Sequence, residues 1–180
     1  MPRYIAFLRA INVGGRNVSM EKLRSCFEEL RFQRVETFIA SGNVIFNTRS
    51  AKVDALQVKI ESTLLKALGY EVKTFIRTDA EVAAVATYKP FSSSMMESAA
   101  ALNVGFLEEE LTVEQLEKVA HFKTEIDDFH VQGRELYWLC RVKQSDSKFS
   151  NVMLERALKK KATFRGLNTI KRLAAKYPPT

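Results

Sequence analysis

The chain has 180 residues, of which 46% are hydrophobic and 27% charged, and its net charge is +7 at pH 7. This length suffices for one large or two small domains with a buried core, and the composition is that of an ordinary globular protein. No run approaches the ~20 apolar residues that cross a bilayer and no secretion signal opens the chain, so we expect a cytoplasmic protein without a membrane partner.

The charge is distributed unevenly along the chain. Residues 1–49 carry a net +4, residues 50–140 a net −6 and residues 141–180 a net +9. Two basic ends around an acidic middle indicate an anionic partner near the ends. Lysine-rich helix faces that are simply solvated are the alternative explanation, and the more common one.

Two cysteines, Cys26 and Cys140, lie far apart in the sequence. Cys26 falls on the apolar face of a predicted helix and Cys140 in an apolar strand, so both are expected to be free, buried thiols. The sequence contains no CxxC or HExxH motif, and we predict neither a metal site nor a cofactor.

Strands and helices alternate in the first half of the chain, as its apolar patterns and turn residues indicate. The predicted elements are a strand over residues 4–12, a helix over 19–30, strands over 34–40 and 43–48, a helix over 52–68 and a strand over 71–78. Ser19 is expected to cap the first helix and Gly69 to end the second. The order is therefore β-α-β-β-α-β.

The same order begins again after a short helix over residues 79–88. The predicted elements are a strand over 101–107, a helix that Thr112 caps, strands over 128–132 and 134–142 that turn at Gly133, a helix over 150–160, a strand over 162–165 and a last helix over 168–176. The two halves share little sequence, so the repeat is inferred from the order of the elements alone.

This split βαβ order predicts an α+β fold of two ferredoxin-like βαββαβ units in tandem plus a C-terminal helix. The predicted boundaries are residues 1–78 for the first unit, 79–100 for a short helix and linker, and 101–180 for the second unit with its extra helix. Because both faces of the first strand are apolar, the helix-free face of its sheet should be covered by the second half or by another copy of the chain.

Arg9 stands out in the first predicted strand because it shares a face with Ile5, Phe7 and Ile11. Burying an unpaired guanidinium among apolar neighbours is costly, so a carboxylate of the protein or an anion of a ligand should face it. A structural ion pair is the commoner of these two solutions.

The turn after this strand combines Asn12, Gly14, Gly15 and Arg16 ahead of the helix that Ser19 caps. Glycine tolerates a positive φ and lets a ligand approach the backbone, and a helix N-terminus favours anions. These features suit a phosphate or a carboxylate. The turn is neither a Walker loop nor a GxGxxG motif, and a turn without a ligand is the alternative interpretation.

Three segments together resemble an uncharacterised bacterial family: LRAINVGGRN (residues 8–17), ASGNVIF (residues 40–46) and ATFRGLNTIKRL (residues 162–173). The family is known only as a domain of unknown function, number sixteen-ninety-seven, and the resemblance spans nearly the whole chain. It implies a compact α+β protein with ferredoxin-like halves and no established activity.

The C-terminal segment departs in part from the TTRNWNTV pattern that is usual in this family. The matching residues are Thr163, Arg165, Asn168 and Thr169, and the departing residues are Phe164, Gly166 and Leu167. The missing asparagine and tryptophan weaken the expectation that this segment contacts a ligand.

No catalytic set is evident in the sequence. His121 follows a helix and His130 alternates within a strand, and neither lies in a motif that pairs a nucleophile with a base. The acidic pair Asp127-Asp128 and the acidic run at residues 108–110 are expected to be solvated charges in loops. An enzyme would need residues that converge only in three dimensions.

Recognition of RNA bases by stacking is disfavoured, because it needs aromatic residues on one open sheet face. Tyr137 and Trp138 are neighbours in a predicted strand and should point to opposite faces. Binding to a nucleic-acid backbone stays open through the basic C-terminal residues Lys159, Lys160, Lys161, Arg165, Lys171 and Arg172.

The favoured hypothesis is a protein that binds a small anionic ligand, phosphate- or nucleotide-like, at the strand–Gly-Gly–helix turn. The candidate ligand-binding residues are Arg9, Asn12, Gly14, Gly15, Arg16, Ser41, Asn43, Arg165 and Asn168. The first duty of Ser41-Gly42-Asn43 is expected to be a hairpin turn. A nucleic-acid-associated protein and an enzyme are the alternatives, and no oligomeric state is predicted.

Overall fold

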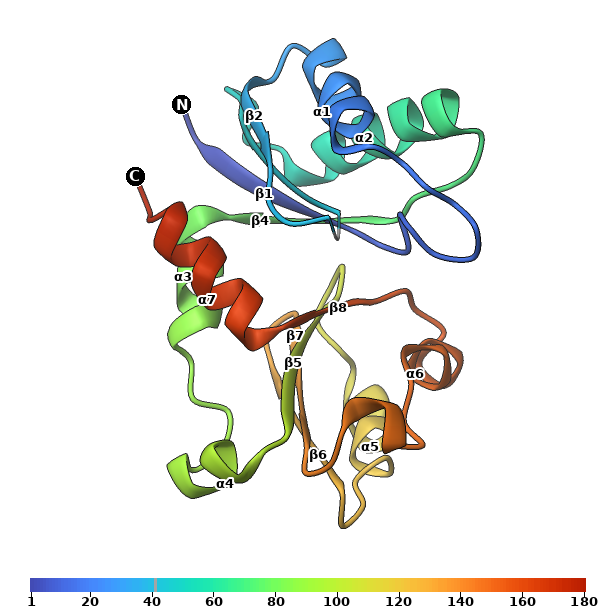
Figure 1. The fold of residues 1–180 in the computed structure, drawn as a ribbon, viewed down its shortest axis with the longest axis vertical. Helices are drawn as coiled ribbons and strands as arrows, with labels where there is room; N and C mark the ends of the chain where they lie inside the picture. The colour runs from blue at the N-terminus through green and yellow to red at the C-terminus, as the bar shows by residue number, and fades with distance from the viewer. Residues whose placement is uncertain (41) are drawn as a thin grey trace. The chain divides into compact units, whose positions relative to one another are not determined.

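The computed structural model describes residues 1–40 and 42–180, and these form a mixed α+β fold (Figure 1). Its described residues make two four-stranded antiparallel sheets and seven α-helices. Contacts within the chain divide it into two compact units: unit 1 comprises residues 1–84 and 173–180, and unit 2 comprises residues 85–172. Each unit contains one of the sheets.

Unit 1 is built on the sheet with strand order β2-β3-β1-β4. Its elements are β1 (Arg3–Leu8), α1 (Met20–Glu29), β2 (Gln33–Thr37), β3 (Asn43–Asn47), α2 (Val53–Leu68) and β4 (Thr74–Thr78). Both α1 and α2 cover the same face of this sheet (Figure 1), and their buried side chains, including Phe27 and Ile60, share one core with the strands.

Two helices follow β4: α3 (Asp79–Thr87), which leads from unit 1 into unit 2, and α4 (Ser93–Ser98). The sequence did not predict α4. Ser92 caps it by accepting a hydrogen bond from the amide of Met95 at 3.3 Å. A serine at this position satisfies an amide that has no partner within the helix, which is why such a short helix forms here.

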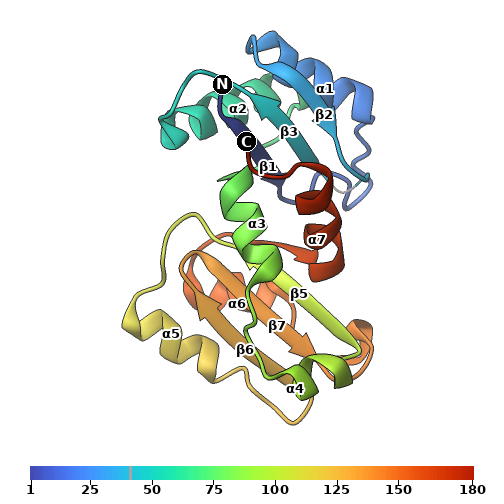
Figure 2. The ribbon, with the colours of Figure 1, turned by 90° about the vertical axis from the view of Figure 1, so that its left-hand side faces the viewer.

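Unit 2 is built on the sheet with strand order β6-β7-β5-β8, and Figure 2 shows β6, β7 and β5 side by side. Its elements are β5 (Ala101–Phe106), α5 (Val113–Ala120), β6 (Asp127–Gln132), β7 (Glu135–Cys140), a 3₁₀ helix (Gln144–Asp146), α6 (Asn151–Leu158) and β8 (Thr163–Gly166). The next helix, α7 (Leu167–Lys176), begins in unit 2, and its residues from Leu173 on belong to unit 1. Val119 of α5 and Leu154 of α6 join Trp138 of β7 in one core, so both helices cover the same face.

The predicted helix ends agree with the structure where the sequence carries a capping residue. The Ser19 hydroxyl accepts from the amide of Lys22 at 3.0 Å, and Thr112 caps α5. Gly69 ends α2 with a φ of 80°, in the left-handed region that glycine adopts without strain. Both cysteines are free and buried, as predicted.

The first strand is shorter than predicted. β1 ends at Leu8, because Ala10 has a φ of 52° and the chain can no longer run extended. The prediction that Arg9 lies in a strand and shares its face with Ile5 and Phe7 is therefore wrong. Arg9 follows the strand, its side chain is half-buried, and its amide donates to the carbonyl of Lys73 at 2.9 Å.

The helix-free face of the first sheet is buried too, as its apolar residues predicted. Ile5, Phe7 and Phe75 lie on that face and are at most 1% exposed. In unit 2, Val104 and Tyr137 occupy the corresponding face and are equally buried. Among the described residues, no helix combines the length and the apolar composition needed to span a bilayer.

Candidate functional site

A hollow of about 470 Å³ lies in unit 2 at the beginning of α7. Its walls come from the end of α4, the start of β5 and the junction of β8 with α7. Four side chains with polar groups line it: Glu97, Asn103, Asn168 and Lys171. Asn168 is the one residue among the predicted ligand contacts that lines this hollow.

The register of the sheet positions this hollow. β8 pairs with β5 so that Gly166 lies opposite Asn103, and the chain passes directly from Gly166 into α7. Leu167 is buried, which fixes the first residue of the helix in the core. Gly166, Leu167 and Asn168, where α7 begins, all line the hollow, and the first amides of a helix have no acceptor within the helix.

The electrostatics of the hollow favour an anion on the α7 side. A helix N-terminus carries a partial positive charge, and Lys171 adds a full one in the second turn of α7. Asn103 is 8% exposed, and its Nδ2 donates to Oε1 of Gln144 at 3.2 Å, which holds the carboxamide in place. Glu97 on the α4 wall carries the opposite charge and would repel a second anionic group.

Arg165 lies one residue before this hollow but does not line it. Its guanidinium donates to Oγ1 of Thr163 at 2.8 Å and to the carbonyl of Phe164 at 2.9 Å. Burial lowers the pKa of Arg165 to about 10, so the group is still charged at neutral pH. The predicted residues Arg165 and Asn168 are thus neighbours in sequence with different surroundings.

The glycine turn lies in unit 1, between β1 and α1, and its residues 12–17 are exposed. Asn12 holds the turn from inside: its Nδ2 donates to the carbonyl of Ala40 at 3.2 Å and its Oδ1 accepts from the amide of Val18 at 2.8 Å. Asn12 was predicted to contact a ligand, but both polar atoms of its side chain form hydrogen bonds that stabilise the turn itself.

Gly14 and Gly15 have φ values of 66° and 81°, as a sharp strand-to-helix connection requires. A Cβ at either position would meet nothing within 4 Å, so the backbone conformation and not crowding selects glycine there. The Arg16 guanidinium lies 4.1 Å from the centre of the Tyr70 ring, a cation–π contact. These contacts stabilise the turn, and the charged Arg16 side chain remains exposed.

Two other predicted residues belong to the β2–β3 connection. Asn43 is fully buried, and its Nδ2 donates to the carbonyl of Phe38 at 2.9 Å, which closes the hairpin. Ser41 lies outside the described residues. Arg9, Asn12, Gly14, Gly15, Arg16 and Asn43 all belong to unit 1, whereas Arg165 and Asn168 belong to unit 2.

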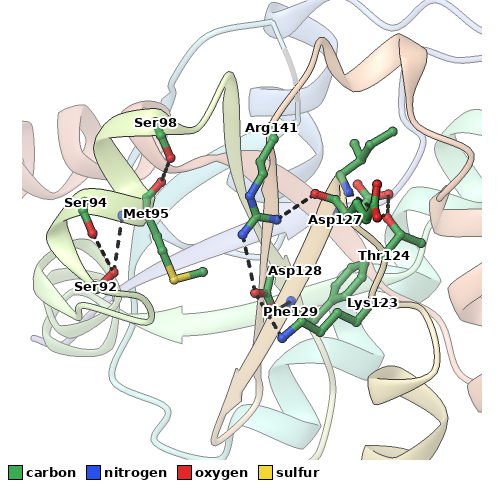
Figure 3. A network of polar contacts seen from close by, with 12 residues as sticks. Ser92, Ser94, Met95, Ser98, Lys123, Thr124, Asp127, Asp128, Phe129 and Arg141 are labelled. Atoms are coloured by element: carbon green, nitrogen blue, oxygen red, sulfur yellow. Dashed lines mark hydrogen bonds and ion pairs between the residues drawn. The ribbon is translucent and has the colours of Figure 1, made fainter.

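The structure corrects the interpretation of Asp127 and Asp128 as solvated loop charges. Both lie in β6 and are 3% and 8% exposed. Asp127 accepts a hydrogen bond from the core residue Trp138, and Asp128 pairs with Lys123 and Arg141. Figure 3 shows Asp127 near Thr124, and Asp128 between Arg141 and Lys123.

Asp127 accepts from Nε1 of Trp138 at 2.8 Å and from the Ser147 hydroxyl at 2.8 and 2.9 Å. These hydrogen bonds replace the water that burial removes from the carboxylate.

Two other titratable groups have structural partners. His121 Nδ1 lies 2.7 Å from the carbonyl of Glu117, and His130 Nε2 lies 2.7 Å from the Tyr88 hydroxyl. Within residues 1–40 and 42–180, no group of three or more His, Cys, Asp or Glu side chains is arranged to hold a metal ion.

The basic C-terminal residues differ in their exposure and in their contacts. Arg165 is buried, and Lys160 forms an ion pair with Glu109 at 2.7 Å. Lys159 occupies the left-handed position that ends α6. Lys171 and Arg172 lie in α7, and of these only Lys171 lines the hollow.

Sequence reasoning missed Asn103 and Glu97 as residues of this hollow. Asn103 is the single polar side chain in the apolar strand Ala101–Phe106, and this exception could have marked it as a candidate site residue. Glu97 carried no signal, because the helix that positions it was not predicted.

Comparisons with known proteins agree with the fold. A family model described as a protein of unknown function, DUF1697, matches residues 1–137. Among solved structures, the chain is similar to the conserved bacterial protein SP0830 from Streptococcus pneumoniae, with 22% sequence identity, 97% of each chain covered and a TM-score of 0.76. No curated protein matches the chain. At this level of identity the similarity speaks for the fold and for no activity.

Proposed function

We propose that this chain, which belongs to the DUF1697 family of proteins of unknown function, binds a small phosphate- or nucleotide-like anion in the hollow at the beginning of α7. The observation that carries the proposal is the convergence of a helix N-terminus, the Lys171 ammonium and two side-chain amides on one hollow of about 470 Å³. Pockets for small ligands have volumes in this range.

The parts of the hollow have complementary roles in this proposal. The first-turn amides of α7 and Lys171 bind the anionic group, since free N–H donors and positive charge meet there. The Asn168 and Asn103 carboxamides bind its neighbouring polar groups. Glu97 on the opposite wall excludes a second anionic group and favours a ligand with one charged end.

The glycine turn of unit 1 is a second location for the same class of ligand. Its residues 12–17 are exposed and include Arg16, and α1 begins directly after it. Because Asn12 is engaged in holding the turn, an anion there would rely on the backbone amides and Arg16 alone. The two locations make different predictions for point variants.

Calorimetric titration with inorganic phosphate and with a nucleoside monophosphate tests the proposal, with thermal unfolding as a second readout. A ligand at a hundred times its Kd should raise Tm by about 5 to 10 °C. Lys171→Ala should weaken binding by about tenfold, and Lys118→Ala, which changes a partly exposed lysine of α5 that pairs with Glu114 and lies outside the hollow, should leave it unchanged.

The variant Arg16→Ala separates the two locations. If Arg16→Ala weakens binding and Lys171→Ala does not, the ligand binds at the glycine turn and the proposed hollow is wrong. If neither phosphate nor the nucleotide binds at millimolar concentration, the proposed function is wrong as a whole.

We further propose that each unit is a ferredoxin-like module and that the protein is cytoplasmic. The order β-α-β-β-α-β, the sheet orders β2-β3-β1-β4 and β6-β7-β5-β8, and the placement of both helices on one face support the first proposal. Nucleic-acid binding and an enzyme activity stay predictions, and the burial of Arg165 removes one of the six cations proposed to contact a nucleic acid.

A further inference from the structure

A second hollow, of about 410 Å³, lies in unit 2 and is walled by aromatic rings. Its rings are those of Trp138, Phe149 and Phe164, and its polar lining comes from residues 144–145 and 150–151. This second hollow shares no lining residue with the proposed anion site. Aromatic walls with a few polar groups are typical of sites for planar organic ligands.

The aromatic walls are held in fixed positions. The rings of Trp138 and Phe149 have centres 4.8 Å apart and planes at 67°, and Phe164 meets Trp138 at 82°. The buried Asp127 carboxylate accepts the indole N–H of Trp138 and the Ser147 hydroxyl. Ser147 in turn accepts from the amide of Phe149 at 3.0 Å. One carboxylate thus orients two of the three walls.

The wall also contains a hydrogen-bond acceptor without a donor. Asn151 Nδ2 donates to the carbonyl of Ala162 at 2.9 Å, which fixes the carboxamide. Its Oδ1 is buried and has no hydrogen-bond partner within the part of the chain that the structure describes. A buried acceptor without a donor is destabilising, and this oxygen belongs to a residue that lines the hollow.

The aromatic hollow and the anion hollow are connected by three residues that lie side by side on neighbouring strands of the sheet. Asn103 of β5 lies opposite Trp138 of β7 on one side and opposite Gly166 of β8 on the other. Trp138 lines the aromatic hollow and Gly166 the anion hollow. These two residues are two strand spacings apart, roughly 10 Å. Asn103 also donates to Gln144, so a residue of each hollow is joined by a hydrogen bond.

We infer that the ligand is a nucleoside phosphate whose base occupies the aromatic hollow and whose phosphate lies at the beginning of α7. The base packs against the partly exposed ring of Phe164 and against the edges of Trp138 and Phe149, which are 3% and 6% exposed. The sugar spans the row at Asn103. This inference rests on the proposed function, because it assigns the phosphate to the same anion site.

Tryptophan fluorescence tests this inference directly, because Trp138 is the only tryptophan of the chain. A base bound against the indole should quench its emission, whereas inorganic phosphate and ribose 5-phosphate should not. In calorimetry, a nucleoside monophosphate should bind at least tenfold more tightly than ribose 5-phosphate. Equal affinities and an unchanged emission would overturn the inference and leave the proposed anion site intact.

A pair of matched variants gives a second test. Phe164→Leu removes one aromatic wall and should reduce nucleotide affinity at least fivefold, with phosphate affinity unchanged. Phe122→Leu changes another ring of the same core that does not line the hollow, and it should alter neither affinity. A nucleotide affinity that is the same in both variants would contradict the inference.

The remaining outcomes separate the two proposals. Binding of an uncharged nucleoside with quenching, but without any binding of phosphate or effect of Lys171→Ala, would overturn the anion site and support the aromatic hollow alone. Competition by a 5′-phosphorylated dinucleotide would identify the occupant as the end of a nucleic acid, and its absence would identify a free nucleotide. Both results support the assigned site.

Discussion

The two units of this chain place a buried arginine at the same position of their sheets. Arg77 of β4 lies opposite Ile5 of β1, and Arg165 of β8 lies opposite Val104 of β5. In each case the guanidinium donates to the carbonyl of the preceding residue at 2.9 Å. The halves share little sequence, yet each sheet holds its buried arginine with the same hydrogen bond to the preceding carbonyl.

The units differ in their connections, and the candidate sites follow that difference. Unit 1 has a long glycine turn between β1 and α1, whereas unit 2 joins β5 to α5 through residues 107–112 without a glycine. The opposite holds for the connection that follows the third strand of each unit. In unit 2, the segment between β7 and α6 is long, contains the 3₁₀ helix and lines the aromatic hollow. In unit 1, only the five residues 48–52 join β3 to α2. A common framework with different loops is how one fold carries different sites.

The largest expected effect tests whether the core of unit 1 is packed more tightly than that of unit 2. Phe46→Ala removes a fully buried ring that contacts Phe27 and Phe32, and it should lower the free energy of unfolding by about 3 to 5 kcal/mol. Phe149→Ala should cost less, about 2 kcal/mol, since that ring borders a hollow and its residue is 6% exposed, whereas Phe46 is fully buried.

Urea denaturation followed by circular dichroism measures both losses in the same buffer. Val58→Ala, an exposed substitution in α2, serves as the control and should change stability little. Equal losses for Phe46→Ala and Phe149→Ala would show that the aromatic hollow closes in solution.

Much of the fold could be predicted because its signals are local. Apolar periodicity located the strands and helices, and Ser19, Gly69 and Thr112 fixed three helix ends through caps that act within one turn. The first strand was predicted too long, because the sequence Leu8-Arg9-Ala10 contains no residue that favours a left-handed conformation, which Ala10 nevertheless adopts. The Arg9 amide still donates to the carbonyl of Lys73, so the pairing with the segment before β4 extends one residue beyond β1 before the chain turns at Ala10.

The candidate site was less predictable, because its residues converge from separate elements. Asn168 was found from the sequence, whereas Asn103 joins it only through the pairing of β5 with β8. Asp127 was interpreted as a solvated charge, since its partners Trp138 and Ser147 are 11 and 20 residues away in the sequence. The satisfaction of a buried carboxylate by distant donors is a property of the tertiary structure.

The next prediction compares the buried carboxylates of the two units. Asp127→Ala leaves the indole N–H of Trp138 and the Ser147 hydroxyl without an acceptor, and it should destabilise the protein by about 3 kcal/mol. Asp79→Ala should cost less, about 1 to 2 kcal/mol, because its one short hydrogen bond comes from the adjacent Ala80 amide at 2.8 Å, and its contacts with Thr180 and Arg3 are longer, at 3.2 to 3.7 Å.

Urea denaturation again gives both values, and the emission maximum of Trp138 should shift only in the Asp127 variant. A loss at Asp79 that matched the loss at Asp127 would contradict the view that the unit 2 carboxylate organises its surroundings more strongly.

A smaller effect is expected from the residues in the first turns of α1 and α5. In α5, Gln115 accepts from the amide of Thr112 at 2.9 Å and donates to the carbonyl of Leu158 at 3.2 Å, so Gln115→Ala should cost about 1 kcal/mol. Lys22 occupies the same position in α1 and contributes only its backbone amide to the cap. Lys22→Ala should therefore change the free energy of unfolding by less than about 0.5 kcal/mol. A destabilisation by Lys22→Ala equal to that by Gln115→Ala, measured by thermal unfolding, would show that the two caps are equivalent.

The smallest effect on stability, and the finest comparison of the two units, comes from the single cysteine of each. Burial raises the pKa of the Cys26 thiol in unit 1 and of the Cys140 thiol in unit 2 above their ordinary value of 9.0. At pH 8 almost no thiolate is present and neither sulfur is accessible, so the native protein should not react with a disulfide reagent within minutes. Raising the pH from 8 to 9 should accelerate labelling by a larger factor than it does for a free thiol, because a thiol whose pKa lies above 9.0 is still more than half protonated at pH 9. The variants Cys26→Ala and Cys140→Ala each leave one thiol, whose labelling rate then reports the opening of its own unit. Immediate labelling of either thiol in the folded protein would contradict the burial of that unit's core.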